Sequence, residues 1–168
     1  MKLIHKVKIT KKFIYLLLLS IIIFFIDRVT KIKIVENLND KVIYVNNYIN
    51  LDLVWNTGIG FGLLNFDSAG FYNLVTLLVA SVILLLFYYL ILSDTADKII
   101  FSIMIGGALG NFYDRLTYNA VPDFIDLHYK TFHWFTFNMA DIFITLSIII
   151  FIIRGFFKIG RASCRERV

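Results

Sequence analysis

The sequence predicts an all-α membrane protein with four transmembrane helices and a small extracytoplasmic β-sheet. Hydrophobic types make up 59% of the 168 residues and charged types 17%, whereas soluble domains average about 45–50% and about 25%. Four segments approach the length of about 20 apolar residues that a helix needs to cross about 30 Å of hydrocarbon. Lysine and arginine gather toward the two ends of the chain. The composition excludes an ordinary soluble enzyme, and the 17% of aromatic residues excludes a disordered chain.

The four predicted spans differ in how clearly the sequence defines them. The second, about residues 71–92, has no charged residue and is the clearest. The first, about residues 13–33, begins like a signal peptide, but Asp27-Arg28-Val29-Thr30-Lys31 follows its apolar stretch in place of a small-residue cleavage site. We therefore expect a retained helix. The third, about residues 99–113, and the fourth, about residues 137–153, are long enough only if their polar ends enter the membrane.

The distribution of charge predicts how these spans are oriented. The first twelve residues carry five lysines and no acid, and Arg154 and Lys158 follow the fourth span. The connection of residues 34–70 is acidic apart from one lysine. Because cytoplasmic segments carry an excess of Lys and Arg, we place both termini and the short connection 93–98 in the cytoplasm of a multi-pass membrane protein.

The net charge of +5 is mainly this orientation signal. The cations do not form a stripe with interleaved aromatic residues, so we expect no nucleic-acid partner. Residues 1–160 form a single integral-membrane domain. Residues 161–168 hold three of the six arginines and one of the two glutamates, and this change of composition is typical of a non-native tail.

The external connections predict a small sheet on the outer membrane surface. Residues 41–54 contain alternating stretches typical of short strands, and residues 124–129 form a second candidate strand. We expect Trp55 and Trp134 to lie in the interfacial aromatic belt. The polar groups of the second connection are expected at the surface: Asp126, His128 and His133.

Polar residues near the outer ends of the spans converge on one layer at the outer membrane boundary. Spacings of three and four residues place each set on one helix face, and ionisable residues inside membranes are functional candidates by default. The sets are Asp27 with Lys31, Asn111 with Asp114 and Arg115, and Asn138 with Asp141, joined by Asn56 and Asp123 from the connections. Structural interpretations stay open, namely a helix-stabilising pair at Asp27, a cap or topology anchor at Asp114 and a simple turn at Asn56. The small residues of Gly106-Gly107-Ala108 and Gly110 permit close helix approach.

The chemistry available to this layer is that of carboxylates. The sequence has no HExxH and no G-x-S-x-G motif, and its single cysteine, Cys164, lies in the tail. We therefore expect no metal and no other cofactor. Two aspartates that lie close together cannot both ionise easily, so one keeps a proton. Such a pair can activate water and protonate a carbonyl oxygen, which hydrolyses an amide; the residues alone do not say which aspartates form it.

Five motifs resemble the bacterial lipoprotein signal peptidases (signal peptidase II) in order and spacing. They are Asp27-Arg28-Val29-Thr30-Lys31, Asn56-Thr57-Gly58-Ile59-Gly60-Phe61, the stretch from Gly106 to Arg115, Val121-Pro122-Asp123-Phe124 and Phe137-Asn138-Met139-Ala140-Asp141. The resemblance covers about residues 13–155. Two departures are Gly60, where the family often has Ala, and Pro122, where Val is common.

The resemblance implies a membrane aspartyl endopeptidase whose catalytic pair is Asp123 and Asp141. It implies a prolipoprotein substrate that carries diacylglycerol on a cysteine, cleaved just before that cysteine. The enzyme would act as a monomer among membrane lipid, with its active site near the outer face. Asp114 would pair with a nearby cation. The residues that would bind substrate or support the pair are Asp27, Lys31, Asn56, Gly58, Asn111, Arg115 and Asn138.

Two other functions fit a small polytopic protein. A channel or transporter subunit would carry charges at midplane depth or paired broken helices, and the sequence has neither. A non-catalytic assembly protein could use the glycine-rich third span for packing, but it gives no reason for two aspartates to meet at one depth.

Overall fold

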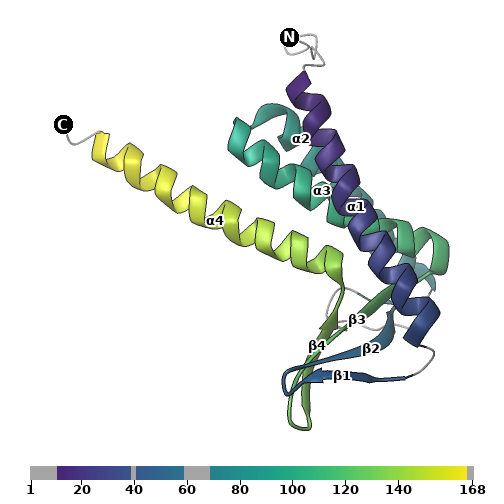
Figure 1. Cartoon of the computed structure of the whole chain (residues 1–168). Helices are drawn as coiled ribbons and strands as arrows, with labels where there is room; N and C mark the ends of the chain where they lie inside the picture. Colours follow the sequence, from purple (N-terminus) through teal and green to yellow (C-terminus); the bar gives the residue numbers. More distant parts are fainter. Residues whose placement is uncertain (1–10, 39–40, 59–68, 166–168) are drawn as a thin grey trace.

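The computed structural model describes residues 11–38, 41–58 and 69–165, and these ranges contain the four expected helices (Figure 1). They are α1 (Lys11–Leu38), α2 (Ala69–Leu92), α3 (Thr95–Tyr118) and α4 (Met139–Arg165). In the described part of the chain, three stretches are long and apolar enough to cross a membrane: Lys11–Leu38, Tyr72–Leu92 and Met139–Lys158. The fourth helix, α3, is polar toward its C-terminal end, and this end lines the candidate site described below.

α3 is longer at both ends than the predicted span of residues 99–113. It begins after Asp94, whose side chain caps the helix by accepting a hydrogen bond of 3.0 Å from the amide of Asp97. It ends at Asn119, which has a left-handed backbone with φ of 54°. Such a residue is a common helix stop, and here it turns the chain into the sheet.

α3 is the central helix and packs against α1, α2 and α4. A Cβ atom on Gly106 would lie 2.6 Å from both the Ile23 Cβ and the Ser20 carbonyl oxygen of α1, and one on Gly107 would lie 2.9 Å from the Ala140 carbonyl oxygen of α4. The absence of side chains at these positions lets the three backbones approach closely, as the small residues predicted.

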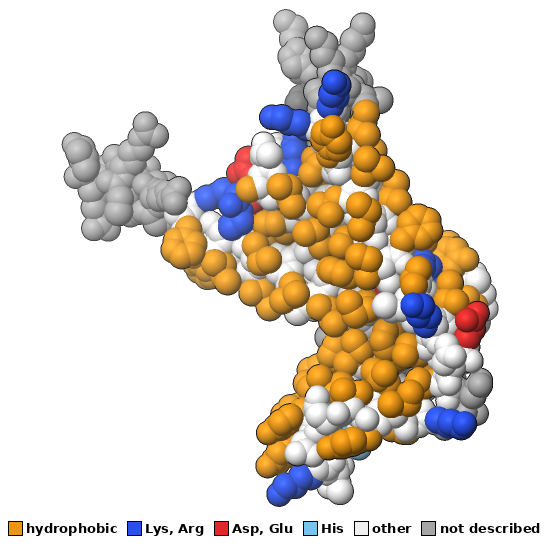
Figure 2. Space-filling model, in the orientation of Figure 1, with side chains coloured by type: hydrophobic (Ala, Val, Ile, Leu, Met, Phe, Trp, Pro, Cys, Tyr) orange, Lys and Arg blue, Asp and Glu red, His pale blue; other side chains and the backbone are white. Residues whose placement is uncertain are grey.

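A compact apolar cluster joins the C-terminal end of α2 to the N-terminal half of α3. It is formed by Leu90, Ile100, Phe101, Met104 and Ile105. Large apolar side chains also cover the outward surfaces of the helices, and Lys and Arg gather near the ends of α1 and α4 (Figure 2). This exposed apolar surface is what lipid contact requires.

Ion pairs connect the C-terminal half of α4 to the start of α3. Arg154 Nε lies 2.9 Å from Asp97 Oδ1, and Lys158 Nζ lies 2.6 Å from Asp94 Oδ2. The hydrogen bond from Lys158 lowers the pKa of the Asp94 carboxyl to about 2. Both cations were predicted only as orientation signals, and the structure gives them a packing role as well.

A four-stranded antiparallel sheet lies at the end of the helices where α3 ends and α4 begins. Its order is β1 (Ile43–Asn46), β2 (Ile49–Asn56), β3 (Val121–Tyr129) and β4 (Phe132–Phe137). The strands predicted from residues 41–54 and 124–129 are confirmed, and β3 begins three residues earlier than expected, so that it includes Asp123. Strand β4 was not predicted, because no element was expected between residue 129 and the fourth span, and that span begins at Met139, two residues later than predicted.

The expectation that Asp126, His128 and His133 lie at the surface is wrong for two of the three. Asp126 and His128 are only 3% and 6% exposed, because β3 is paired on both sides by β2 and β4. The His133 side chain is 57% exposed. Trp55 and Trp134 are exposed on the sheet, as a position in an interfacial belt requires.

Candidate active site

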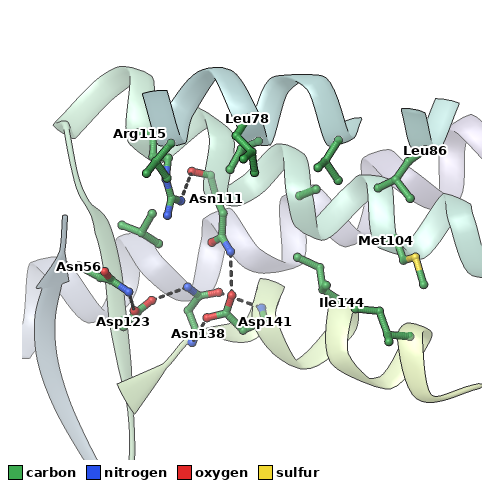
Figure 3. A pocket seen from close by; sticks show the side chains of 16 residues that line it. Asn56, Leu78, Leu86, Met104, Asn111, Arg115, Asp123, Asn138, Asp141 and Ile144 are labelled. Atoms are coloured by element: carbon green, nitrogen blue, oxygen red, sulfur yellow. Dashed lines mark hydrogen bonds between the residues drawn. The ribbon is translucent and has the colours of Figure 1, made fainter. Parts of the chain in front are cut away.

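Asp123 and Asp141 come from different elements and meet through Asn138 (Figure 3). Asp123 lies near the start of β3, and Asp141 lies in the first turn of α4. The Asn138 Nδ2 donates to Asp123 Oδ1 at 2.5 Å, and the Asn138 backbone N–H donates to Asp141 Oδ2 at 3.1 Å. One asparagine therefore contacts both carboxylates and sets their relative position.

Asn138 holds this position because it also caps α4. Its Oδ1 accepts from the Asp141 backbone N–H at 3.1 Å, while the Asp141 carboxylate accepts from the Asn138 backbone N–H. This reciprocal arrangement is a capping box, which satisfies amide groups that a helix start leaves unpaired. The predicted N–x–x–D spacing thus has a structural as well as a chemical role.

Asp123 is held from its other side by Asn56 at the end of β2. The Asn56 Nδ2 donates to Asp123 Oδ2 at 2.9 Å, and its Oδ1 accepts from the Gly58 backbone N–H at 2.9 Å. Asp123 is only 3% exposed. Burial, followed by the nearby charge of Asp141, raises the pKa of the Asp123 carboxyl to about 6, against the lowering effect of the two asparagines.

Asn111 connects the pair of aspartates to a cation. Its Nδ2 donates to Asp141 Oδ1 at 2.8 Å, and its Oδ1 accepts from Lys31 Nζ at 2.8 Å. Because the lysine fixes which end of the amide is the acceptor, the other end must present N–H groups to Asp141. Lys31 therefore orients Asn111 without touching either aspartate of the pair.

Lys31 sits in a buried ion cluster between α1 and α3. Its Nζ also donates to Asp27 Oδ2 at 2.8 Å and to Asp114 Oδ2 at 2.7 Å, and its side chain is 1% exposed. Arg28 Nη1 lies 2.6 Å from Asp114 Oδ1. The other oxygen of Asp27 accepts from the Ala140 backbone N–H at 3.0 Å, so the cluster also fixes the start of α4. The predicted pair of Asp27 with Lys31 and the local pairing of Asp114 are confirmed.

Arg115 joins the helices to the turn after β2. Its Nη2 donates to the Gly58 carbonyl oxygen at 3.0 Å and its Nη1 to the Asn111 carbonyl oxygen at 3.3 Å. The Arg115 carbonyl oxygen accepts from the Tyr72 hydroxyl of α2 at 2.8 Å. Gly58 and Arg115 thus belong to the same polar layer as the aspartates, although neither is hydrogen-bonded to them.

Both aspartates border a pocket of about 360 Å³ between α2, α3 and α4. Polar side chains gather at the end of the pocket next to the sheet, where Asn56, Asn111 and Arg115 join the pair of aspartates. The remainder is apolar and extends along the helices away from the sheet. The apolar lining residues are Val75, Leu78, Val79, Val82, Leu86, Met104, Ala108, Val121, Ile144 and Ile148.

The structure thus brings every predicted site residue into one connected polar network. Asp27 is the most remote, because it reaches Asp141 through Lys31 and Asn111. Sequence reasoning did not single out Arg28, Tyr72 and the Ala140 amide. The position of Arg28, one residue after Asp27 and opposite an acid on α3, could have suggested its ion pair, whereas nothing in the sequence marks Tyr72. Among the described residues, no group of three or more His, Cys, Asp or Glu side chains is arranged to hold a metal ion.

Comparison with known proteins gives consistent matches over most of the chain. The family model described as Signal peptidase (SPase) II matches residues 19–157. The lipoprotein signal peptidase of Pelagibacter ubique is 44% identical over 84% of this chain and 87% of its own length. That of Thermodesulfovibrio yellowstonii is 38% identical over 82% of this chain and 91% of its own. A bacterial membrane enzyme solved by the in meso method at 2.3 Å superposes with a TM-score of 0.72 at 26% identity, covering 88% of this chain and 90% of that one.

Proposed function

Since the chain belongs to the signal peptidase II family, we propose that it cleaves prolipoproteins in the bacterial inner membrane by an aspartic mechanism in which Asp123 and Asp141 activate water. The observation that carries the mechanism is the shared contact of both carboxylates with Asn138 at the head of a membrane pocket. Membership of a peptidase family also favours an enzyme over a channel subunit or an assembly protein.

The proposed reaction needs one ionised and one protonated carboxyl. Asp123, with its pKa of about 6, is ionised above that pH and takes a proton from water as the water oxygen adds to the scissile carbonyl carbon. Asp141 donates its proton to the carbonyl oxygen, which gives a tetrahedral diol. Asp123 then protonates the departing amine, one diol hydroxyl returns a proton to Asp141, and the C–N bond breaks. The pair ends in its starting state.

The asparagines keep the pair in position for this exchange of protons. Asn56 and Asn138 donate to Asp123, and Asn111 donates to Asp141. Their amide groups stabilise a carboxylate but cannot neutralise it, unlike a lysine or an arginine. The pair therefore stays free to carry a proton.

We assign the substrate's apolar parts to two neighbouring pockets. The long pocket between α2, α3 and α4 has the apolar lining and the membrane depth that a signal peptide requires. A second apolar pocket of about 250 Å³ lies beside Asp141, where α4 meets β4, and is lined by Phe135, Phe137, Ile142 and Leu146 among others. It offers a place for the acyl chains of the modified cysteine, next to the scissile bond.

In this proposal the active site faces the extracytoplasmic side and both termini face the cytoplasm. One copy of the chain supplies every residue of the site, so a monomer suffices. Reporter fusions after Leu92 and after Ile153 should both report a cytoplasmic location. An extracytoplasmic signal from either fusion would contradict the orientation and with it the outward position of the pair.

Cleavage of a diacylglyceryl-modified prolipoprotein tests the mechanism directly. Asp123→Asn and Asp141→Asn should each abolish the gel shift that marks loss of the signal peptide, because neither amide can exchange a proton in this way. Asp52→Asn is the matched control, since it removes the same charge from β2 at a residue that does not border the described pockets near the pair. Cleavage at the wild-type rate by either site variant would show that the pair is wrongly assigned.

A further inference from the structure

Asp123 borders a second, chemically different pocket on the sheet. This pocket has a volume of about 250 Å³ and is lined only by residues of β2, β3 and β4, whereas the long apolar pocket is formed mainly by helices. The two pockets share Asn56 and Asp123. The proposed catalytic carboxylate therefore stands in the wall between a mainly apolar pocket among the helices and a more polar pocket on the sheet, in which Val54, Trp134 and Phe135 are the apolar lining residues.

The sheet pocket has an acidic wall that catalysis does not use. Asp126 is 3% exposed, and its Oδ2 lies 2.7 Å from His133 Nδ1 and accepts from Asn50 Nδ2 at 3.4 Å. His133 and Thr136 of β4 complete the polar lining near it. Among the described residues, neither lysine nor arginine lines this pocket, so Asp126 has only a histidine to offset its charge.

We propose that this sheet pocket holds the side chain of the residue that directly follows the lipidated cysteine, and that Asp126 makes it favour cationic over acidic side chains. The inference rests on the proposed cleavage reaction. A prolipoprotein changes character at the scissile bond, from an apolar signal peptide before it to a water-soluble chain after it. The two pockets that meet at Asp123 change character in the same direction.

The walls of the pocket explain the expected preference. An acidic side chain there would face the carboxylates of Asp123 and Asp126 without a lysine or arginine to neutralise it, and like charges at an interface select against a partner. A lysine would be attracted by the same groups. A glutamine would take an intermediate place, because it can donate a hydrogen bond to Asp126 without carrying charge.

Competition between synthetic lipopeptides tests the assignment. Three diacylglyceryl-cysteine substrates that differ only in Lys, Gln or Glu after the cysteine are mixed, and the ratios of kcat/KM are read from the products. The wild-type protein should prefer Lys to Glu by about fivefold or more, the size of effect that one like-charge contact gives. Because the three substrates compete for the same enzyme in one mixture, the ratio of their kcat/KM values does not depend on how much of a variant is folded.

Two variants should change this ratio in different ways. Asp126→Asn should bring it close to one, and Thr136→Lys, which adds a cation to the wall, should reverse it in favour of Glu. Asp52→Asn, which removes a charge from the same sheet away from the pocket, should leave the ratio as in the wild type.

The outcomes separate this inference from the proposed function. Cleavage of none of the three lipopeptides by the wild-type protein would refute the function itself. Cleavage of all three at equal rates, or a ratio that neither Asp126→Asn nor Thr136→Lys alters, would overturn the pocket assignment while the function stands. If Asp126→Asn proves inactive, the pocket assignment is decided by whether Thr136→Lys reverses the preference for Lys over Glu.

Discussion

Lys31→Met is expected to destabilise the protein strongly, although the residue touches neither proposed catalytic aspartate. Lys31 Nζ makes three hydrogen bonds of 2.7 to 2.8 Å, to Asp27, Asn111 and Asp114, and its side chain is 1% exposed. Methionine has a similar shape and length but no charge and no donor. The variant would leave Asp114 paired with Arg28 alone and Asp27 with no ion pair, only the hydrogen bond from the Ala140 backbone N–H.

The size of the effect follows from this arrangement. Removing one partner of a buried ion pair costs about 3–5 kcal/mol, because the other charge stays buried without compensation. Asn111 would also lose the donor that fixes its orientation toward Asp141. In a chain of this length, such a loss corresponds to a fall in melting temperature on the order of 10 °C.

Thermal unfolding of the purified protein in detergent measures this effect. Lys33→Met is the matched control, because Lys33 is exposed on the same helix, and it should shift the melting temperature little. Adding Asp27→Asn to Lys31→Met removes the carboxylate that has lost its ion pair and should recover part of the loss, because Asp114 still has Arg28 as a partner. Equal melting temperatures for Lys31→Met and Lys33→Met would refute the view that the ion cluster holds α1 against α3.

The other predictions concern packing, proton exchange and metal. Gly110→Ala should destabilise by about 1–3 kcal/mol, because its Cβ would overlap a carboxylate of α1, whereas Gly155→Ala, with open space around its Cβ, should be neutral or slightly stabilising in a thermal melt. The value of kcat/KM should fall as the pH drops below about 6, because Asp123 is then protonated and both carboxyls of the pair carry a proton. Asn56→Ala removes a hydrogen bond that lowers this pKa, so the acid limb should move to higher pH; an unmoved limb would contradict the assignment of the base. Chelators should leave the cleavage rate unchanged, and a loss restored by added metal would count against the carboxylate mechanism.

The helices and the polar layer could be predicted because their signals are local. The uncharged run of residues 71–92 defines a span on its own, and the pairs Asp27–Lys31 and Asn138–Asp141 follow from helical spacing. Convergence of these pairs then followed from the alternating direction of the spans. The two aspartates were singled out only through the resemblance to a family, since spacing alone does not choose between Asp123 and the other acids.

What could not be predicted depends on contacts between distant segments. Strand β4 is a short aromatic run directly before a helix, and periodicity does not separate such a run from the helix that follows it. Its pairing with β3 is what buries Asp126 and His128. The Tyr72 hydroxyl donates to a backbone oxygen of Arg115, and a contact to backbone depends on the packing of α2 against α3.

The balance of charge in the polar layer supports the single proton that the proposed mechanism assigns to the pair of aspartates. The charged residues of this layer are the cations Arg28, Lys31 and Arg115 and the carboxylates Asp27, Asp114, Asp123 and Asp141. The carboxylates outnumber the cations by one, and an uncompensated buried charge is costly. Lys31 and Arg28 are committed to the ion cluster, whereas Asp123 and Asp141 accept from amide groups. The excess charge is therefore relieved at the pair, by one proton, and this is the protonation state that the proposed hydrolysis requires.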